Sequence, residues 1–211
     1  MSHQPAHPLT PTLPPPTSER VRIRQVEVLS DSWYTLKKTT FDYRMRDGRW
    51  QTLSRETYDR GNGATLLLFN RTRATVLLTR QFRFPAYVNG CADGLLIETC
   101  AGLLDGQSPE AAIRREAQEE LGVEVGAVTK IMEAYMSPGS VTEKLHFFVG
   151  EYERPQSRDA GNVEEGEEIE VLELALDDAL SKIARGEIQD GKTILLLLWA
   201  RAHLAADLAR A

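Results

Sequence analysis

The chain has 211 residues, which is enough for one domain with a sizeable core plus a small additional unit, and too few for two full-sized domains. Its formal net charge is −6 and it has no run of basic residues, which excludes nucleic acid and strongly anionic membranes as expected partners. The two cysteines, Cys91 and Cys100, form no CxxC or CxxH pattern, so we expect a reduced, cytoplasmic protein.

Residues 1–19 are rich in proline and hold six of the ten prolines of the chain. They contain neither the apolar centre of a signal peptide nor a charged amphipathic pattern, so we expect a disordered tail. No later stretch approaches the roughly 18 consecutive apolar residues that a membrane span requires. The sequence therefore predicts no association with a membrane.

Alternating apolar and polar residues predict a three-stranded antiparallel sheet within residues 20–57. Its strands are expected at residues 21–28, 34–45 and 50–55. Asp47 and Gly48, between the last two strands, are typical of a tight hairpin turn. This sheet forms the first of two predicted units, and the second unit spans residues 58–211.

The second unit is expected to contain further strands and at least three helices. Strands are predicted at residues 64–69, 75–82, 95–100, 130–136, 145–152 and 169–174. Asp177 or Asp178 should cap a helix that ends near Arg185, and a last helix should begin near Thr193. Its apolar stripe is predicted at Leu195, Leu198, Trp199, Ala202 and Ala206. Strands followed by helices that flank mixed sheets favour an α/β sandwich with an attached N-terminal sheet.

The sequence predicts an unusually acidic helix from Pro109 to Leu121. Ser108 is a good N-cap, proline suits the first helical position, and Gly122 is a natural stop. Within the helix Glu116, Glu119 and Glu120 stand at i, i+3 and i+4, so their side chains lie on adjoining faces.

Carboxylates in the last turn of a helix oppose its macrodipole, and a like-charged i,i+4 pair costs roughly 0.2–0.5 kcal/mol. A bound divalent cation such as Mg²⁺ or Mn²⁺ would offset this cost, because hard cations take carboxylate oxygens and keep waters that a phosphate can replace. The alternative is a solvated acidic face neutralised by Arg114 and Arg115. Spacing alone leaves both interpretations open.

The run REAQEELG, from Arg115 to Gly122, resembles the REUxEExGU part of the Nudix box. Further runs resemble the GDP-mannose pyrophosphatases within the ADP-ribose pyrophosphatase branch of that family, namely YDRGNGATLLL, RQFR, IETCAGLLD, AYMSPG and EIQDGKT. The likeness covers nearly everything after Val26. It implies a Nudix α/β/α sandwich and favours the metal interpretation of the helix.

The chain departs from the usual box at its start. Gln107 stands where the box has its leading glutamate, and Ala101 stands where it has glycine. Gly102 is expected to supply the turn one residue later, so that the loop before the helix is shortened. Any role of the leading glutamate is then lost or taken by Glu110.

The resemblance implies metal-dependent hydrolysis of the pyrophosphate bond in a nucleoside diphosphate sugar. By family position, Glu116, Glu120 and the carbonyl of Ala101 would bind the metal, with Arg115 and Glu119 orienting the site. The base that activates water would be Glu167, which would also bind metal, in the acidic loop at residues 163–170.

The same matching implies a set of substrate-binding residues: Trp33, Arg55, Glu56, Arg83, Gly102, Leu103, Glu143 and Lys192. The arginines can fork onto phosphate oxygens, and an indole can stack on a base. Ordinary roles are the alternative, with Trp33 in the core and Arg83 a surface charge at a strand end. The family also implies a homodimer in which residues 33–56 complete the partner's site.

The resemblance implies GDP-mannose as substrate, giving GMP and mannose 1-phosphate. ADP-ribose, giving AMP and ribose 5-phosphate, is the alternative within the same class. A non-catalytic nucleotide-sugar sensor is an alternative from another class. Such a sensor normally carries a DNA-binding domain and a damaged acidic helix, and the sequence shows neither.

Overall fold

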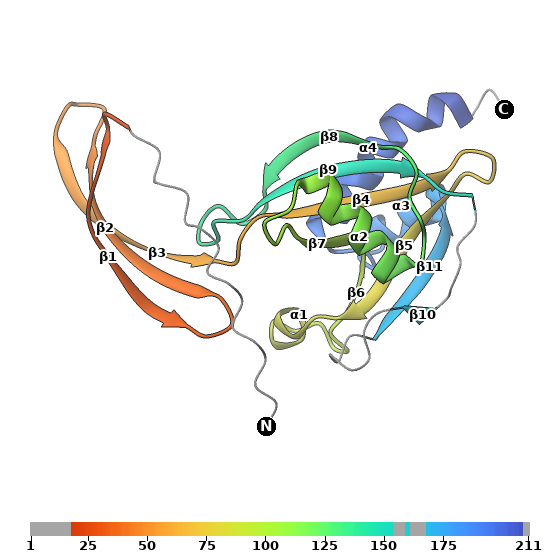
Figure 1. The fold of residues 1–211 in the computed structure, drawn as a ribbon, viewed down its shortest axis with the longest axis horizontal. Helices are drawn as coiled ribbons and strands as arrows, with labels where there is room; N and C mark the ends of the chain where they lie inside the picture. The colour runs from red at the N-terminus through yellow and green to blue at the C-terminus, as the bar shows by residue number, and fades with distance from the viewer. Residues whose placement is uncertain (1–17, 154–158, 161–167, 209–211) are drawn as a thin grey trace. The chain divides into compact units, whose positions relative to one another are not determined.

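The computed structural model describes residues 18–153, 159–160 and 168–208, and the chain divides into two compact units (Figure 1). The smaller unit comprises Met1–Asn62 and Tyr135–Lys144, and the larger comprises Gly63–Ala134 and Leu145–Ala211. Nearly all of the predicted tail lies outside the described residues. The segment Tyr135–Lys144 groups with the N-terminal sheet, whereas the sequence pattern predicted it in the second unit.

The smaller unit contains the predicted three-stranded antiparallel sheet. Its strands are β1 (Val21–Asp31), β2 (Thr35–Arg44) and β3 (Trp50–Asp59), in that order across the sheet. The turn between β2 and β3 is closed by a hydrogen bond of 2.8 Å from the Met45 N–H to the Arg49 carbonyl. Gly48 has a φ of 86° there, which explains the preference for glycine at this position.

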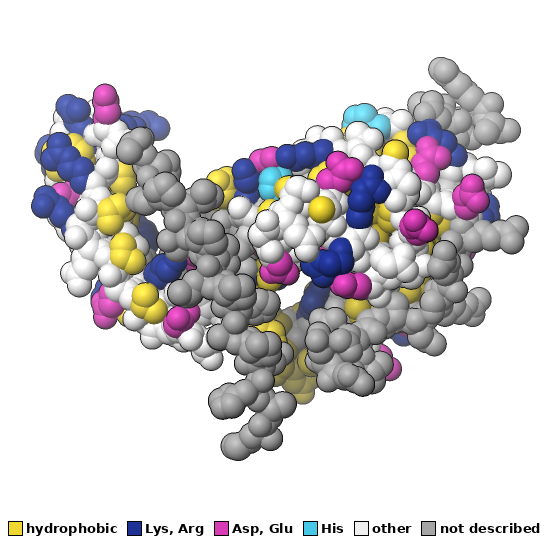
Figure 2. Space-filling model, viewed as in Figure 1, with side chains coloured by type: hydrophobic (Ala, Val, Ile, Leu, Met, Phe, Trp, Pro, Cys, Tyr) yellow, Lys and Arg dark blue, Asp and Glu magenta, His cyan; other side chains and the backbone are white. Residues whose placement is uncertain are grey.

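Strand β1 exposes nearly all of its residues. Ile23, Val26 and Val28 are 45%, 54% and 57% exposed, and hydrophobic side chains are visible at the surface of this sheet (Figure 2). A sheet of three strands needs an apolar face that is covered to be stable in isolation. The exposed residues of β1 therefore leave part of the apolar surface of this sheet uncovered.

The larger unit is built on an eight-stranded mixed sheet. Its main path runs β10 (Asp159–Ala160), β11 (Ile169–Ala175), β5 (Thr75–Phe82), β4 (Gly63–Asn70), β9 (Lys144–Glu151) and β8 (Val128–Tyr135). Strands β4 and β9 are parallel, whereas β5 is antiparallel to both β4 and β11. The mixed sheet confirms the predicted fold class.

Strands β4 and β5 pair only near their connecting turn, between residues 68–70 and 75–77, and beyond that point each has another partner. Strand β6 (Leu95–Glu98) pairs with β5, and β7 (Cys100–Leu103) pairs with β4. The single predicted strand at 95–100 is therefore wrong in form. The chain changes partner at Thr99 and continues to Leu103.

Helices cover both faces of this sheet (Figure 1). Alternate residues of β4 point to opposite faces. Leu66 and Leu68 pack in one core cluster with Ile113 and Leu121 of helix α2 (Pro109–Leu121). Helices α3 (Leu176–Ala184) and α4 (Gly191–Leu208) pack together, and α4 contacts β4 and β6. This arrangement is the predicted α/β/α sandwich.

The predicted ends of α2 are confirmed. The Ser108 hydroxyl accepts a hydrogen bond of 3.3 Å from the Ala111 N–H, Pro109 is the first helical residue, and Gly122 ends the helix at a φ of 63°. Only glycine, and to a lesser extent asparagine, adopts that conformation readily. Local sequence therefore determines where the last turn, which carries the carboxylates, ends.

The last two helices differ from their predictions. Helix α3 has Ala175 as its N-cap, whose methyl group cannot accept a hydrogen bond, and the Leu176 N–H donates to the Ala74 carbonyl. Asp177 and Asp178 lie in its first turn and do not cap it. A short helix, α1 (Phe84–Val88), was not predicted at all.

The apolar stripe assigned to α4 is also wrong. This helix begins at Gly191 and buries Leu196, Leu197, Ala200 and Leu204, whereas Leu195 and Leu198 are exposed. Among the helices of the described residues, none combines the length and apolar character that a membrane crossing requires.

Candidate active site

The acidic helix α2 turns its two predicted metal-binding glutamates inward. Glu120 is only 8% exposed, and the side chain of Glu116 is 14% exposed, whereas that of Glu119 is 57% exposed. Positions i and i+4 lie on one face of a helix, so Glu116 and Glu120 share the face that meets the sheet. The solvated-face alternative does not describe these two residues.

Strand β7 forms the other side of the site. The Ala101 N–H donates to Glu120 Oε2 over 3.3 Å, which ties the end of α2 to this strand. Gly102 lies directly against Glu116: a Cβ built on it would come within 2.1 Å of Glu116 Cδ. Gly102 does not have a positive φ, so the prediction that it supplies a turn is wrong. The left-handed turn follows at Asp105 and Gly106.

Arg115 links the acidic side chains around the mouth of the site. Its guanidinium donates to Glu116 Oε1 over 2.7 Å and to Glu119 Oε2 over 2.9 Å, and Asp105 Oδ2 lies 3.7 Å away. Its buried Nε has no hydrogen-bond partner among the described residues. Arg115 therefore positions two glutamates of the box. Asp105, which the sequence did not indicate as a site residue, is a third acidic residue near the same guanidinium.

The two inward glutamates both have raised pKa values. Burial raises the pKa of Glu120 to about 7, and the neighbouring Glu116 carboxylate adds to this increase against the opposing effect of the Cys100 thiol. Burial likewise raises the pKa of Glu116, even though Arg115 opposes the shift. Two buried carboxylates with raised pKa values form a site that a cation would stabilise.

A divalent metal fits this donor set. The described residues contain no group of three or more acidic, histidine or cysteine side chains that would hold a metal alone. The two inward carboxylates nevertheless suit a hard divalent cation, which prefers oxygen ligands and can be completed by waters and substrate phosphates. The third predicted carboxylate, Glu167, lies outside the described residues.

The raised pKa of Glu120 predicts a pH-dependent stability for the metal-free protein. A carboxyl whose folded pKa is raised stabilises the fold below its unfolded pKa, near 4.5, and this contribution is lost as pH rises through about 7. The expected loss is on the order of 3 kcal/mol. Urea unfolding in EDTA at pH 5 and pH 8 measures it.

Glu120→Gln is the control for this prediction, since it should remove most of the loss between the two pH values. Added Mg²⁺ should restore the stability of the wild type at pH 8, because metal and proton compete for the same oxygens. Identical pH profiles of the wild type and Glu120→Gln would contradict the assignment.

Two predicted substrate-binding cations, Arg83 and Lys192, meet at a carboxylate that the sequence analysis overlooked. Arg83 Nε and Nη2 lie 2.7 Å and 3.2 Å from the two oxygens of Glu98, and Lys192 Nζ contacts Glu98 Oε2. Lys192 also lies 3.1 Å from Asp190. Arg83 is therefore no isolated surface charge. A glutamate in the otherwise apolar run LLIE was the signal that could have revealed Glu98.

Four of the predicted substrate residues belong to the smaller unit, whereas Leu103, like Gly102, lies in β7 of the larger unit. Arg55 and Glu56 line a hollow of about 620 Å³ together with Tyr135 and residues 138–142. The segment 138–142 is held against β3 by hydrogen bonds from the Tyr58 N–H to the Ser140 carbonyl (2.8 Å) and from the Thr142 N–H to the Tyr58 carbonyl (3.1 Å). The fold thus gathers two of the predicted residues around one hollow.

Trp33 and Glu143 have different surroundings in the same unit. Trp33 is 67% exposed and meets Tyr34 edge to face at 6.2 Å, which excludes the alternative that it belongs to the core. The largely buried Glu143 carboxylate lies 3.5 Å from Arg60 Nε, and the Arg60 guanidinium lies over the Tyr34 ring.

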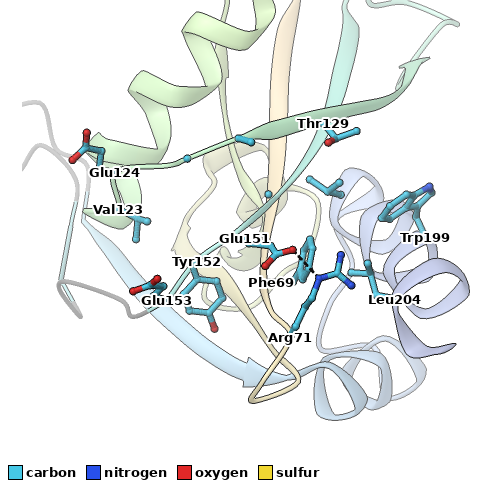
Figure 3. Close-up of a pocket in the computed structure, with 14 residues that line it drawn as sticks. Phe69, Arg71, Val123, Glu124, Thr129, Glu151, Tyr152, Glu153, Trp199 and Leu204 are labelled. Atoms are coloured by element: carbon cyan, nitrogen blue, oxygen red, sulfur yellow. Dashed lines mark hydrogen bonds and ion pairs between the residues drawn. The ribbon is translucent and has the colours of Figure 1, made fainter. Parts of the chain in front are cut away.

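A further hollow, of about 870 Å³, lies at the other end of β4 and β9 (Figure 3). It has an apolar floor that includes Phe69 and Leu204, and its rim carries the ion pair of Arg71 and Glu151 at 2.7 Å. None of the predicted site residues lines it. Its size alone therefore gives no reason to place the chemistry there.

The family models that match this chain meet at the end of β3. Residues 20–58 match the model of the GDP-mannose pyrophosphatase NudK N-terminal domain, and residues 59–197 match the NUDIX domain. The chain is a member of the Nudix family. It is therefore a Nudix hydrolase, and the sensor alternative has no support.

Individual relatives are similar in sequence to this chain over most of its length. A GDP-mannose pyrophosphatase of Salmonella paratyphi B is 54% identical over 188 residues, which cover 89% of this chain and 98% of that protein. One from Yersinia pestis is 54% identical over 187 residues, covering 88% and 94%. A crystal structure of an ADP compounds hydrolase aligns with a TM-score of 0.69 at 18% identity, covering 91% of this chain and 98% of that one, and shows the same fold.

Proposed function

We propose that this Nudix hydrolase cleaves GDP-mannose into GMP and mannose 1-phosphate. The observation that carries the proposal is the 54% identity to GDP-mannose pyrophosphatases over 89% of the chain, which includes the small N-terminal unit as well as the acidic helix. Phosphate chemistry is shared across the family, so the choice of base and sugar depends on residues outside the helix.

Glu116, Glu120 and the Ala101 carbonyl are proposed to hold Mg²⁺, with Mn²⁺ as the alternative. When bound, the metal would neutralise charge on the pyrophosphate oxygens. Arg115 holds Glu116 and Glu119 in place through the contacts above. Buried, pre-positioned groups of this kind stabilise developing charge more strongly than solvated ones.

Glu167 is proposed as the base that activates the attacking water. Although it lies outside the described residues, the next residue, Glu168, lines a hollow of about 350 Å³ with Arg83 and Glu170. Glu170 is paired with Arg80 at 2.6 Å, so its carboxylate is already engaged. A carboxylate suits this role because it can accept a proton from the attacking water.

The substrate contacts are proposed by chemical type. Arg83 and Arg55 can bind phosphate oxygens in a forked geometry, and the exposed indole of Trp33 can stack on guanine. Glu56 and Glu143 can accept hydrogen bonds from guanine or the sugar. Three more contacts complete the proposed set: Gly102, Leu103 and Lys192.

Turnover of competing substrates tests this function. The protein with Mg²⁺ is incubated separately with GDP-mannose, ADP-ribose and ADP-glucose, and products are identified by chromatography. We expect GMP and mannose 1-phosphate from the first substrate at clearly higher kcat/KM than for the others. Dominant formation of AMP and ribose 5-phosphate from ADP-ribose would overturn the choice of substrate, and no turnover at all would overturn the proposal.

A homodimer is proposed as the functional state. The apolar residues exposed on β1 and the exposed Trp33 suit burial against a second copy, so that residues 33–56 would complete the partner's site. Sedimentation velocity should give twice the chain mass of 23.6 kDa, and a monomer at micromolar concentration would contradict it. Cys91 and Cys100 are free thiols. A cytoplasmic location is proposed, and no nucleic acid or membrane partner is proposed.

A further inference from the structure

Glu98 is a charged side chain in a position where charge is costly. It ends strand β6 and is only 2% exposed, directly after the apolar residues Leu95, Leu96 and Ile97. A buried carboxylate persists only when it is paired and hydrogen-bonded. The role of Glu98 can therefore be inferred from the residues that pair with it.

Both partners of Glu98 are cations from other elements. Arg83 follows β5, and Lys192 lies in the first turn of α4, 94 residues away in sequence. Burial acts to raise the pKa of Glu98, but Lys192 and Arg83 together hold it below the usual value. The carboxylate is thus ionised and doubly paired.

The two cations are not equivalent. The Lys192 side chain is 11% exposed and its ammonium is shared between Glu98 and Asp190. The Arg83 side chain is 39% exposed and uses only Nε and Nη2 for Glu98. Among the described residues, none accepts a hydrogen bond from Arg83 Nη1. The terminal edge of the guanidinium, made of Nη1 and the second proton of Nη2, is therefore available for an anion.

Glu98 itself is held rigidly from both sides. The Thr79 hydroxyl donates to the Glu98 carbonyl over 3.3 Å, and the next N–H, of Thr99, donates to the Thr193 hydroxyl over 2.7 Å. Thr193 is in turn bonded to Asp190, which also contacts Lys192. The backbone around Glu98 is thus fixed before any ligand binds.

We propose that Glu98 is a positioning residue that fixes the plane of the Arg83 guanidinium and presents its terminal edge to a substrate phosphate. This inference rests on the proposed pyrophosphate hydrolysis and assigns no contact between Glu98 and substrate. Lys192 is the buried third member of the cluster, and its two carboxylate contacts leave one ammonium N–H for the substrate contact proposed for it. A forked arginine that is already oriented loses little freedom when it binds an oxyanion, which is the advantage of such an arrangement.

A double-mutant cycle tests whether Glu98 acts through Arg83. We expect Glu98→Gln to lower kcat/KM for the best nucleotide-sugar substrate at least about tenfold, the order expected when a charge-assisted hydrogen bond is lost. In the Arg83→Gln background the same change should cost less than about threefold, since its target is gone. Equal losses in both backgrounds would overturn the proposal.

Two further variants distinguish a positioning role of Glu98 from a role in stabilising the fold alone. Glu98→Asp retains the buried charge, so it should fold, but it shortens the side chain and should also lower kcat/KM. Glu173→Gln breaks the matched Arg73–Glu173 pair, whose Nη2–Oε1 distance is 2.7 Å, and should leave kcat/KM unchanged. Wild-type activity in Glu98→Asp together with an additive cycle would show that Glu98 only supports the fold.

A spectroscopic readout separates this proposal from the proposed function. The ¹⁵N–¹H signal of Arg83 Nε, assigned by its loss in Arg83→Lys, should exchange slowly in the wild type and broaden in Glu98→Gln. Inorganic pyrophosphate should shift it in the wild type only. An Nε signal unaffected by Glu98→Gln would overturn the positioning role even in an active enzyme. An inactive wild type with the expected Nε behaviour would instead overturn only the proposed reaction.

Discussion

Glu120→Gln is expected to lower kcat by about 10³-fold or more, because loss of metal-derived charge stabilisation is worth several kcal/mol of activation free energy. Glu120 is the more buried of the two inward glutamates and is bonded to the Ala101 N–H of the facing strand. Its amide replacement keeps the size and shape of the side chain but cannot supply an anionic ligand. The measurement is steady-state kinetics with saturating substrate over a range of Mg²⁺ concentrations.

The fold should survive this substitution. In the absence of metal the buried, ionised carboxylate destabilises the fold at neutral pH, as its pKa of about 7 indicates. The uncharged glutamine side chain removes this destabilisation. Circular dichroism and thermal unfolding should therefore match or exceed the wild type. Glu124→Gln, at an exposed position just beyond the same helix, is the control and should retain full activity. A loss of less than tenfold in Glu120→Gln would contradict its role as a metal ligand.

The acidic helix could be predicted from sequence because all of its determinants are local. Ser108, Pro109 and Gly122 mark its ends within a span of fifteen positions, and the structure keeps each of them in its expected role. The fold class was indicated by strands followed by helices that flank mixed sheets, and by the resemblance to the Nudix family. These features depend on neighbours in the chain, and the prediction needed no knowledge of tertiary contacts.

The wrong predictions concern features of the helices that tertiary contacts determine. In α4 the run of leucines from Leu195 to Leu198 is apolar on every side, so the phase of the buried stripe depends on which face meets the sheet. The cap of α3 is replaced by a bond from the Leu176 N–H to Ala74, about a hundred residues earlier in the chain. Neither contact leaves a periodic signal in the sequence.

The sequence predicted which types of residue form the candidate site, but it did not predict which of them pair with one another. The box motif indicated Glu116 and Glu120, but the pairing of Glu98 with Lys192 joins elements 94 residues apart. The change of partner at Thr99, from β5 to β4, places Glu98 and Ala101 on successive short strands. Only the divergence of β4 and β5 makes room for that crossing, and no local pattern encodes it.

Gly102→Ala is expected to lower kcat/KM about 10²-fold while leaving the protein folded. The added methyl carbon would lie within 2.1 Å of Glu116 Cδ and Oε1, so the carboxylate must move away from its present position. A misplacement of about 1 Å in a catalytic group costs on the order of 10²-fold in rate. Because the atoms in the way are the end of a flexible side chain, the free energy of unfolding should change by only about 1 kcal/mol.

This combination distinguishes close approach from the turn that the sequence first suggested for Gly102. A glycine required for a left-handed turn would destabilise the fold when replaced, whereas Gly102 lies in β7 without a positive φ. Gly126→Ala is the matched control, since no heavy atom lies within 4 Å of the position that its methyl carbon would take and its φ is not positive, and it should keep both activity and stability. Urea unfolding together with kinetics at several Mg²⁺ concentrations decides the case. A Gly102→Ala protein that is stable and fully active would show that Glu116 does not depend on this glycine for its place in the site. An unstable one would contradict the prediction that the Glu116 side chain absorbs the clash.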